Sequence, residues 1–199
     1  AATIEAEKAD KAAAEALVIQ TNAEAELSQA QPAMDAAAAA VDCLSKGMLT
    51  ELKSLPKPPA GVDMVTACCL ILVEKEFKNH KWDRAKKMMA NVDKFLQSLI
   101  AFDKDNLSEI LCEYVETKFL TQENFKPEII KTKSGAAAGL CSWCINICKY
   151  FRIYQMVAPK REMLAAANEK LEAANTKLAA IQKKLDELDA KLDKLREKF

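Results

Sequence analysis

The chain has 199 residues, half of them hydrophobic, and its 29 basic and 29 acidic side chains leave no formal net charge. Only 4 residues are glycine, and no segment shows the alternating β-branched pattern of a sheet, so the composition argues against a β protein. It has no secretory signal and no apolar run near the roughly 20 residues of a membrane span. We therefore predict an all-α protein that does not bind a membrane.

Residues 1–41 are rich in alanine and favour a long helix, the first arm of a coiled coil. Small or apolar side chains follow one face of it: Ala6, Ala9, Ala13, Ala16, Ala23, Leu27, Ala30, Met34, Ala37, Val41 and Leu44. Two stripes compete on this arm, displaced by about half a heptad: Ala6, Ala13, Gln20, Leu27 and Met34, and Ile4, Lys11, Val18, Ala25 and Pro32. Because alanine gives little packing specificity, the arm suits two registers.

The middle segment, residues 42–158, differs from the arms, because prolines interrupt it and divide it into shorter helical stretches. We expect helices over residues 42–55, 63–73, 82–90, 93–100, 105–119 and 127–133, and a last one that begins at Ser134 and continues into the second arm. The expected caps are Asp63, Asp105 or Asn106, and Ser134. The expected core includes the stripe Leu107, Ile110, Leu111, Tyr114, Val115 and Phe119, and the aromatic residues Phe77, Phe95, Phe102, Phe125 and Trp143.

Residues 159–199 form the second arm, with a heptad seam. Its apolar residues recur every seven positions at Leu164, Leu171, Leu178, Leu185, Leu192 and Phe199, with Ile181, Leu188 and Leu195 between them. The first arm has 2 basic and 7 acidic side chains and residues 159–199 have 10 and 8, so the net charges of −5 and +2 favour an antiparallel pair. The alternative is that each arm pairs with another molecule. Both ends stop within the heptad pattern, so we expect a piece of a longer polypeptide.

Seven cysteines are present, and Cys141 and Cys144 form a CxxC motif. A structural zinc site takes four ligands, but the chain has no second CxxC and only one histidine, His80. We expect Cys141, Cys144 and Cys148 to be reduced core thiols on one helix, and we predict no metal and no cofactor.

The common catalytic motifs for phosphate binding, zinc proteases and serine hydrolases are missing. His80 has no acid or nucleophile beside it in sequence, and Asp103 and Asp105 are explained as residues near a helix start. We therefore predict a protein that binds a partner and is not an enzyme.

Residues 42–158 hold 17 basic and 14 acidic side chains, a local excess of +3. The basic residues gather on three segments: Lys46, Lys53 and Lys57; Arg84, Lys86 and Lys87; Lys131 and Lys133. If the segments share a face, they form a surface for an acidic partner. The alternative is a set of ordinary solvated side chains.

Several short motifs resemble the distal stalk of dynein heavy chains. They are Gln-Pro-Ala-Met at 31–34, Leu-Thr-Glu-Leu-Lys-Ser-Leu at 49–55, Pro-Pro-Ala-Gly-Val at 58–62, Phe-Asp-Lys-Asp-Asn at 102–106 and Val-Ala-Pro-Lys-Arg at 157–161. Trp82, the stretch from Phe125 to Pro127 and the stretch from Ser134 to Trp143 follow in the family's order. The resemblance covers essentially the whole chain.

The resemblance implies a small bundle of about six helices, the microtubule-binding domain, at the tip of an antiparallel coiled-coil stalk. The AAA+ ATPase ring of such a motor would lie outside this chain. It implies that Lys46, Lys53, Lys57, Arg84, Lys86, Lys87, Lys131 and Lys133 face tubulin, and that Pro32 and Pro159 mark the junction of stalk and head. It also implies that the stalk carries the nucleotide state by sliding between two registers. Ser45 and Thr132 stand where cytoplasmic relatives have basic residues, which favours an axonemal dynein of cilia or flagella. An RNA-binding helical hairpin and a structural coiled-coil scaffold are the alternatives; under the dynein interpretation no nucleic acid binds.

Overall fold

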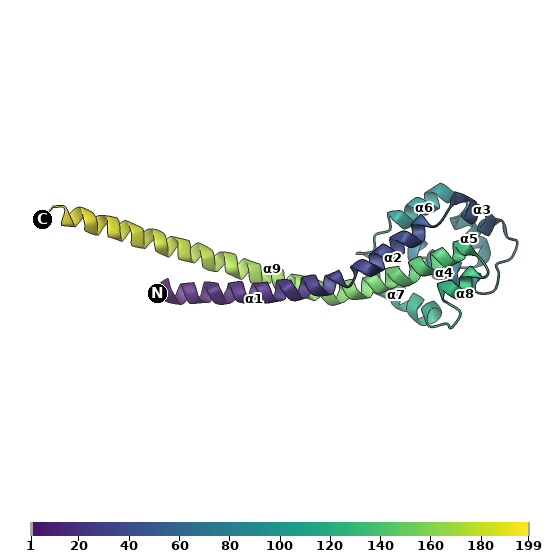
Figure 1. Cartoon of the computed structure of the whole chain (residues 1–199), viewed down its shortest axis with the longest axis horizontal. Helices are drawn as coiled ribbons and strands as arrows, with labels where there is room; N and C mark the ends of the chain where they lie inside the picture. The colour runs from purple at the N-terminus through teal and green to yellow at the C-terminus, as the bar shows by residue number, and fades with distance from the viewer. Residues whose placement is uncertain (1, 199) are drawn as a thin grey trace. The chain divides into compact units, whose positions relative to one another are not determined.

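The computed structural model describes residues 2–198, and every secondary-structure element among them is a helix (Figure 1). The predicted all-α class is confirmed. Phe199, the last position of the predicted heptad seam, lies outside the described residues. The chain divides into two compact units: one contains the terminal segments up to Leu27 and from Met156, and the other is Ser28–Gln155. The predicted division into two arms and a head, with boundaries at residues 42 and 158, stays a prediction.

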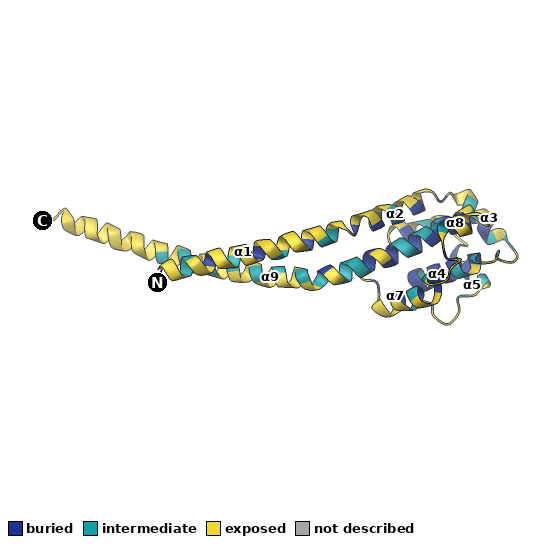
Figure 2. Ribbon diagram, turned by 60° about the horizontal axis from the view of Figure 1, so that its bottom comes forward, coloured by how far each residue is buried: buried dark blue, intermediate teal, exposed yellow. Residues whose placement is uncertain are grey.

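The first unit is an antiparallel pair formed by α1 (Ala2–Ser28) and the C-terminal part of α9 (Gly135–Arg196), as Figures 1 and 2 show. On α1 the buried positions are Ala9, Ala16 and Ala23, each 5% exposed. On α9 the half-buried positions alternate three and four residues apart: Leu164, Ala167, Leu171, Ala174, Leu178 and Ile181. The predicted antiparallel coiled coil is confirmed, with alanines on one side and larger residues on the other.

The two predicted stripes of α1 differ in their exposure. Ile4 is 56% exposed and Val18 59%, and Lys11 and Ala25 of the same stripe are also exposed. In the other stripe Ala13 and Gln20 are exposed, whereas Ala6 and Leu27 are half-buried. The face of α1 that points toward α9 therefore lies between the two stripes, and it carries the buried alanines that recur every seven residues.

The C-terminal end of α9 carries exposed leucines. Leu185, Leu188, Leu192 and Leu195 are 43–55% exposed. In Figure 1 this part of α9 extends past the first residues of α1. The seam predicted there has no packing partner among residues 2–198.

The predicted single helix over residues 1–41 is wrong, because α1 ends at Ser28 and α2 (Gln31–Asp42) begins after a short turn. Pro32 lies in the first turn of α2. A proline has no N–H to donate to the carbonyl four residues earlier, so it suits the start of a helix better than its interior. Pro159, in contrast, lies inside the 62-residue helix α9, which continues through it.

The second unit is a bundle of α2, the start of α9 and the helices between them. These are α3 (Lys46–Ser54), α4 (Val62–Glu74), α5 (Trp82–Met88), α6 (Val92–Ile100), α7 (Glu109–Val115), the π-helix η1 (Glu116–Leu120) and α8 (Pro127–Lys131). Helix α4 packs against α5 and α7, and α3 packs against α5 and α6. The bundle is more finely divided than the about six helices predicted, because α2 joins it and the segment 105–119 contains a loop and two helical pieces.

The core of the bundle centres on Trp143, which is 1% exposed, with the ring of Phe102 edge-on at 5.2 Å between centroids. Phe95 and Phe125 are also buried, so these predictions are confirmed. Two core predictions are wrong. Phe77 is 38% exposed, because α4 ends at Glu74 and the residue lies in the loop beyond. Ile110 is 72% exposed, because α7 turns Leu111 and Cys112 inward instead.

Helix caps were predicted with mixed success. The Ser134 Oγ accepts the Ala137 N–H at 3.1 Å, which confirms the cap of α9. Asp63 is not a cap: α4 is preceded by Gly61, whose φ of 91° lies in the left-handed region that glycine adopts without strain. Asp105 and Asn106 are not caps either, since α7 starts after Ser108 and the Asp105 carboxylate accepts the Tyr150 hydroxyl.

The first head helix was predicted over 42–55, but residues 43–45 separate it from the preceding one. The Ser45 Oγ accepts the Met48 N–H at 3.1 Å and so caps α3. Within residues 2–198, no helix combines the length and the apolar character that crossing a membrane requires.

Candidate functional site

The basic residues of α3 face its neighbours in the bundle. The Lys46 Nζ lies 2.5 Å from the Asp93 Oδ1 of α6, and both side chains are about two-thirds exposed (68% and 66%). The Lys53 Nζ donates to the Ala90 carbonyl at 2.8 Å, beyond the end of α5. Both lysines therefore help to hold α3 against adjacent segments while their positive charge stays near the surface.

The basic residues of α5 have acidic partners. The Arg84 Nη2 lies 2.6 Å from the Glu74 Oε2 at the end of α4, with side chains 36% and 26% exposed. The Lys86 Nζ lies 3.5 Å from the Asp83 Oδ1 one turn earlier on the same helix. Part of the positive charge predicted for this segment is therefore balanced locally.

Four of the predicted site residues, Lys57, Lys87, Lys131 and Lys133, are exposed and make no ion pair with any residue between 2 and 198. Their charges are available to a partner. This property distinguishes them from Lys46, Arg84 and Lys86.

One hollow brings α3 together with the segment between α8 and α9. It has a volume of about 320 Å³, and Met48, Leu52, Lys131 and Lys133 border it. Glu51 is on the same rim, so the hollow is not purely basic. The structure thus places α3 beside Lys131 and Lys133, but Lys46, Lys53 and Lys57 do not border the hollow.

Lys87 belongs to another hollow, which it shares with Lys94 of α6. Lys94 was not predicted as a site residue, although it is exposed. The two lysines are seven residues apart, but α5 ends between them at Met88, so helical periodicity in the sequence could not have paired them. Asp93 and Glu74 were missed for the same reason, since their pairing depends on how separate helices pack.

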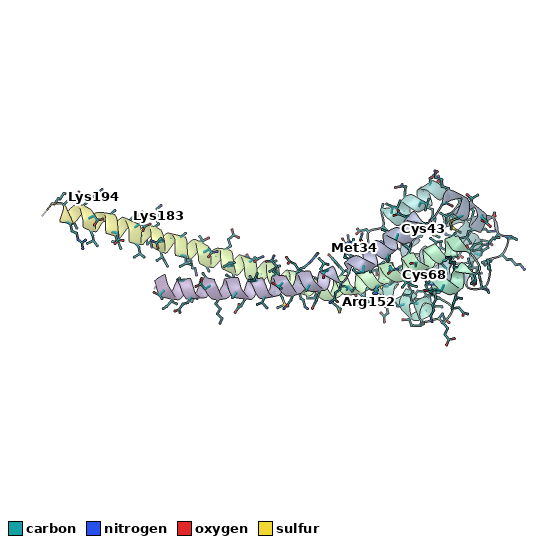
Figure 3. All side chains as sticks on the ribbon, viewed as in Figure 1. Met34, Cys43, Cys68, Arg152, Lys183 and Lys194 are labelled. Atoms are coloured by element: carbon teal, nitrogen blue, oxygen red, sulfur yellow. The ribbon has the colours of Figure 1, made fainter. Side chains whose placement is uncertain are left out.

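All seven cysteines are free thiols, and all of them are buried except the exposed Cys43. Figure 3 labels Cys43 and the buried Cys68. The Sγ atoms of Cys69 and Cys144 are 3.4 Å apart, between α4 and α9. Burial raises the pKa of Cys68 to about 11 and that of Cys141 to about 12. These thiols therefore stay protonated at neutral pH, which makes them weak nucleophiles and poor metal ligands. This agrees with the predicted core role of Cys141, Cys144 and Cys148.

No cluster of three or more histidine, cysteine, aspartate or glutamate side chains suited to a metal ion occurs in the part of the chain that the structure describes. His80 is half-buried, with its ring edge-on to Phe119 at 6.0 Å between centroids. It therefore packs against an aromatic ring of the bundle.

The sequence matches a known protein family over nearly its whole length. Residues 2–199 match the family described as "Microtubule-binding stalk of dynein motor". The chain is 48% identical over 168 residues to the dynein beta chain of the flagellar outer arm of Chlamydomonas reinhardtii, covering 81% of this chain and 4% of that protein. It is 47% identical over 148 residues to human dynein axonemal heavy chain 17, covering 73% and 3%. The chain therefore spans only a small part of the length of these relatives.

A solved structure, titled "Microtubule Binding Domain of DYNEIN-C", has the same fold. The TM-score is 0.57 at 35% sequence identity, and the alignment covers 69% of this chain and 95% of that one. The similarity thus includes both the sequence and the arrangement of the helices.

Proposed function

The chain belongs to the family of microtubule-binding stalks of dynein motors, and from this we propose that it is the distal stalk and microtubule-binding tip of an axonemal dynein heavy chain. Relatives with 44–48% identity are named as axonemal or flagellar dynein chains, which supports a place in the axoneme of a cilium or flagellum. The partners are the microtubule and the rest of the heavy chain. The chain itself does not catalyse a reaction; ATP is hydrolysed in the AAA+ ring outside it.

The observation that carries the proposal is the hollow bordered by α3 together with Lys131 and Lys133. Tubulin has an acidic surface, and exposed ammonium groups without a partner can pair with carboxylates at little cost. Lys57 and Lys87 add two more such groups. We place the microtubule-binding surface on this side of the bundle, with the other basic residues of α3 and α5 at its edge.

The paired basic residues fit the same role. Exposed ion pairs contribute about 0–1 kcal/mol, so Lys46 can leave Asp93 for a tubulin carboxylate at small cost. Arg84 is more enclosed in its pair with Glu74, and Lys53 is tied to a backbone carbonyl. We therefore expect Lys46 to contact tubulin directly, and Arg84 and Lys53 to act more through the placement of α3 and α5.

The antiparallel pair of α1 and α9 carries the nucleotide state of the ATPase ring to the microtubule-binding bundle by a change of coiled-coil register. Two observations fix the register in this structure. Glu26 pairs with Lys160, and Ile19 and Ala167 border one hollow, so seven residues back along α1 correspond to seven forward along α9. Because the alanine seam lacks large knobs, sliding by about half a heptad disrupts little packing. It does, however, separate Glu26 from Lys160, so this ion pair favours the observed register.

Co-sedimentation tests the proposal. The chain should pellet with microtubules, less so as salt rises, because charges are screened beyond about 8 Å at physiological ionic strength. Excess tRNA should not displace it. Displacement by tRNA at equal charge concentration would favour the RNA-binding alternative, and no pelleting at low salt would favour the scaffold.

A further inference from the structure

A cavity of about 180 Å³ lies in the bundle between α2, α6 and α9, on a side that the predicted microtubule-binding residues do not border. Phe102, Trp143 and Tyr150 supply aromatic walls, and Val41 and Leu99 supply aliphatic ones. An apolar protein cavity of about 150 Å³ binds benzene. This cavity therefore has room for one aromatic ring with a short chain.

One side of the cavity carries a negative charge. Asp42 borders it and is the last residue of α2, which has no basic residue in its last turn. The C-terminus of a helix carries a partial negative charge, so an acidic residue there is unfavourable unless a cation is nearby. Asp42 is exposed and makes no ion pair with any residue in the described range 2–198. A cation bound beside Asp42 would therefore be stabilised by both the carboxylate and the C-terminal end of α2.

Lys104 also borders the cavity, but its ammonium group is already engaged. The Lys104 Nζ lies 5.7 Å from the centroid of the Tyr150 ring, where a cation is attracted to the face of the ring. The Tyr150 hydroxyl donates to Asp105, a carboxylate that adds further negative charge on that side. The charge of Lys104 is thus partly balanced within the bundle, whereas that of Asp42 is not.

We propose that this cavity is a binding site for a small arylalkylamine, a single aromatic ring that carries a primary ammonium on a short chain. The ring lies against Phe102 and Trp143, and the ammonium pairs with the Asp42 carboxylate at the negative C-terminal end of α2. Apolar walls with a few placed polar groups are the usual composition of a small-molecule site. An occupant joins α2 to α6 and α9 and so stabilises the bundle.

Titration with 2-phenylethylamine, followed by NMR, tests the site. The chain has two tryptophans, and only Trp143 borders the cavity, so its indole N–H signal should shift while that of Trp82 stays in place. 3-Phenylpropionate has a similar shape and the opposite charge, and it should bind more weakly. The variant Asp42→Asn should weaken amine binding about two- to fivefold, as for the loss of an exposed ion pair, and should leave toluene binding unchanged.

Two variants of α2 provide a matched pair. Ala38 borders the cavity and Ala39 does not, and both are exposed, so leucine is tolerated in the helix at either position. Ala38→Leu should abolish the Trp143 shift, whereas Ala39→Leu should keep it. The proposal is overturned if the amine causes no shift of Trp143, if Ala38→Leu binds it unchanged, or if the propionate binds as tightly as the amine.

Discussion

Arg152 of α9 holds the carboxylate of Glu116, the residue at which α7 passes into the π-helix η1. The Arg152 Nη2 lies 2.7 Å from the Glu116 Oε2, and the Nε donates to both carboxylate oxygens at 3.0 Å. The Cys112 Sγ donates to the same carboxylate at 3.3 Å. The contact with Arg152 holds the pKa of Glu116 below its ordinary value. The pair thus fastens the widened helical turn to the longest helix of the protein.

The Glu116 carboxylate should make the stability of the wild type depend on pH in a defined direction. A glutamate whose pKa is lowered by folding stabilises the protein above its unfolded pKa, about 4.3, and this contribution is lost as pH falls through the folded pKa. Glu116→Gln should therefore lower the free energy of unfolding by about 1–2 kcal/mol at pH 7. Urea unfolding should show the variant and the wild type converging as pH falls below the ordinary glutamate range.

Glu113→Gln is the matched control, because Glu113 is exposed on α7, three residues before Glu116. It should change the unfolding free energy by less than about 0.5 kcal/mol, both at pH 7 and below the ordinary glutamate range. Equal effects of the two variants at pH 7 would show that the Glu116–Arg152 pair adds no specific stability.

Trp143 should be essential to the bundle core. Because its side chain is 1% exposed, Trp143→Ala should cost about 3–5 kcal/mol of unfolding free energy. Phe77 is 38% exposed, so Phe77→Ala should cost about 1 kcal/mol or less. Thermal unfolding followed by circular dichroism measures both. A Trp143→Ala variant that melts like the wild type but fails to pellet with microtubules would assign this residue to the partner surface instead.

The periodicity of the helices could be predicted from the sequence, but the breaks between helices and the contacts between them were predicted less well. The three- and four-residue spacing from Leu164 to Ile181 predicts the seam of α9, because a coiled coil depends on that period alone. Residues 1–41 have a high helix propensity throughout, which hid the break before Pro32. Lys46 and Asp93, or Arg84 and Glu74, meet only through the packing of separate helices, so no local pattern predicts them.

Charge reversal in the proposed microtubule-binding surface should weaken binding without unfolding. Lys131 and Lys133 are the most informative positions, because they are exposed and reversal breaks no ion pair within residues 2–198. Each change to glutamate should raise the microtubule Kd about three- to tenfold and lessen its salt dependence. Reversal of Lys53 or Arg84 is less clear-cut, since each also holds two segments together.

The control for these reversals is Lys183→Glu, an exposed position on the C-terminal part of α9 (Figure 3). It changes the net charge equally, so it separates a local contact from a general electrostatic effect. Pelleting reduced to the same extent by Lys183→Glu and Lys133→Glu would remove the hollow at α3 from the proposed site.

Cross-linking should trap two registers of the coiled coil with different microtubule affinities. In a background with Cys43→Ser, which removes the exposed thiol, cysteines at Ile19 and Ala167 match the register of this structure. Cysteines at Ile19 and Leu171 match one displaced by four residues along α9, which keeps a half-buried seam position in the pair. A tenfold difference in Kd between the two oxidised species would correspond to about 1.4 kcal/mol of coupling between register and binding. Since the bundle and its charges are identical in both species, the difference can arise only through the helices that lead into it.

Reduction is the control for this experiment, and it should restore one common affinity in both variants. Glu26→Lys combined with Lys160→Glu should restore the ion pair that either single change breaks. Equal affinities of the two oxidised forms would mean that the stalk is a passive spacer.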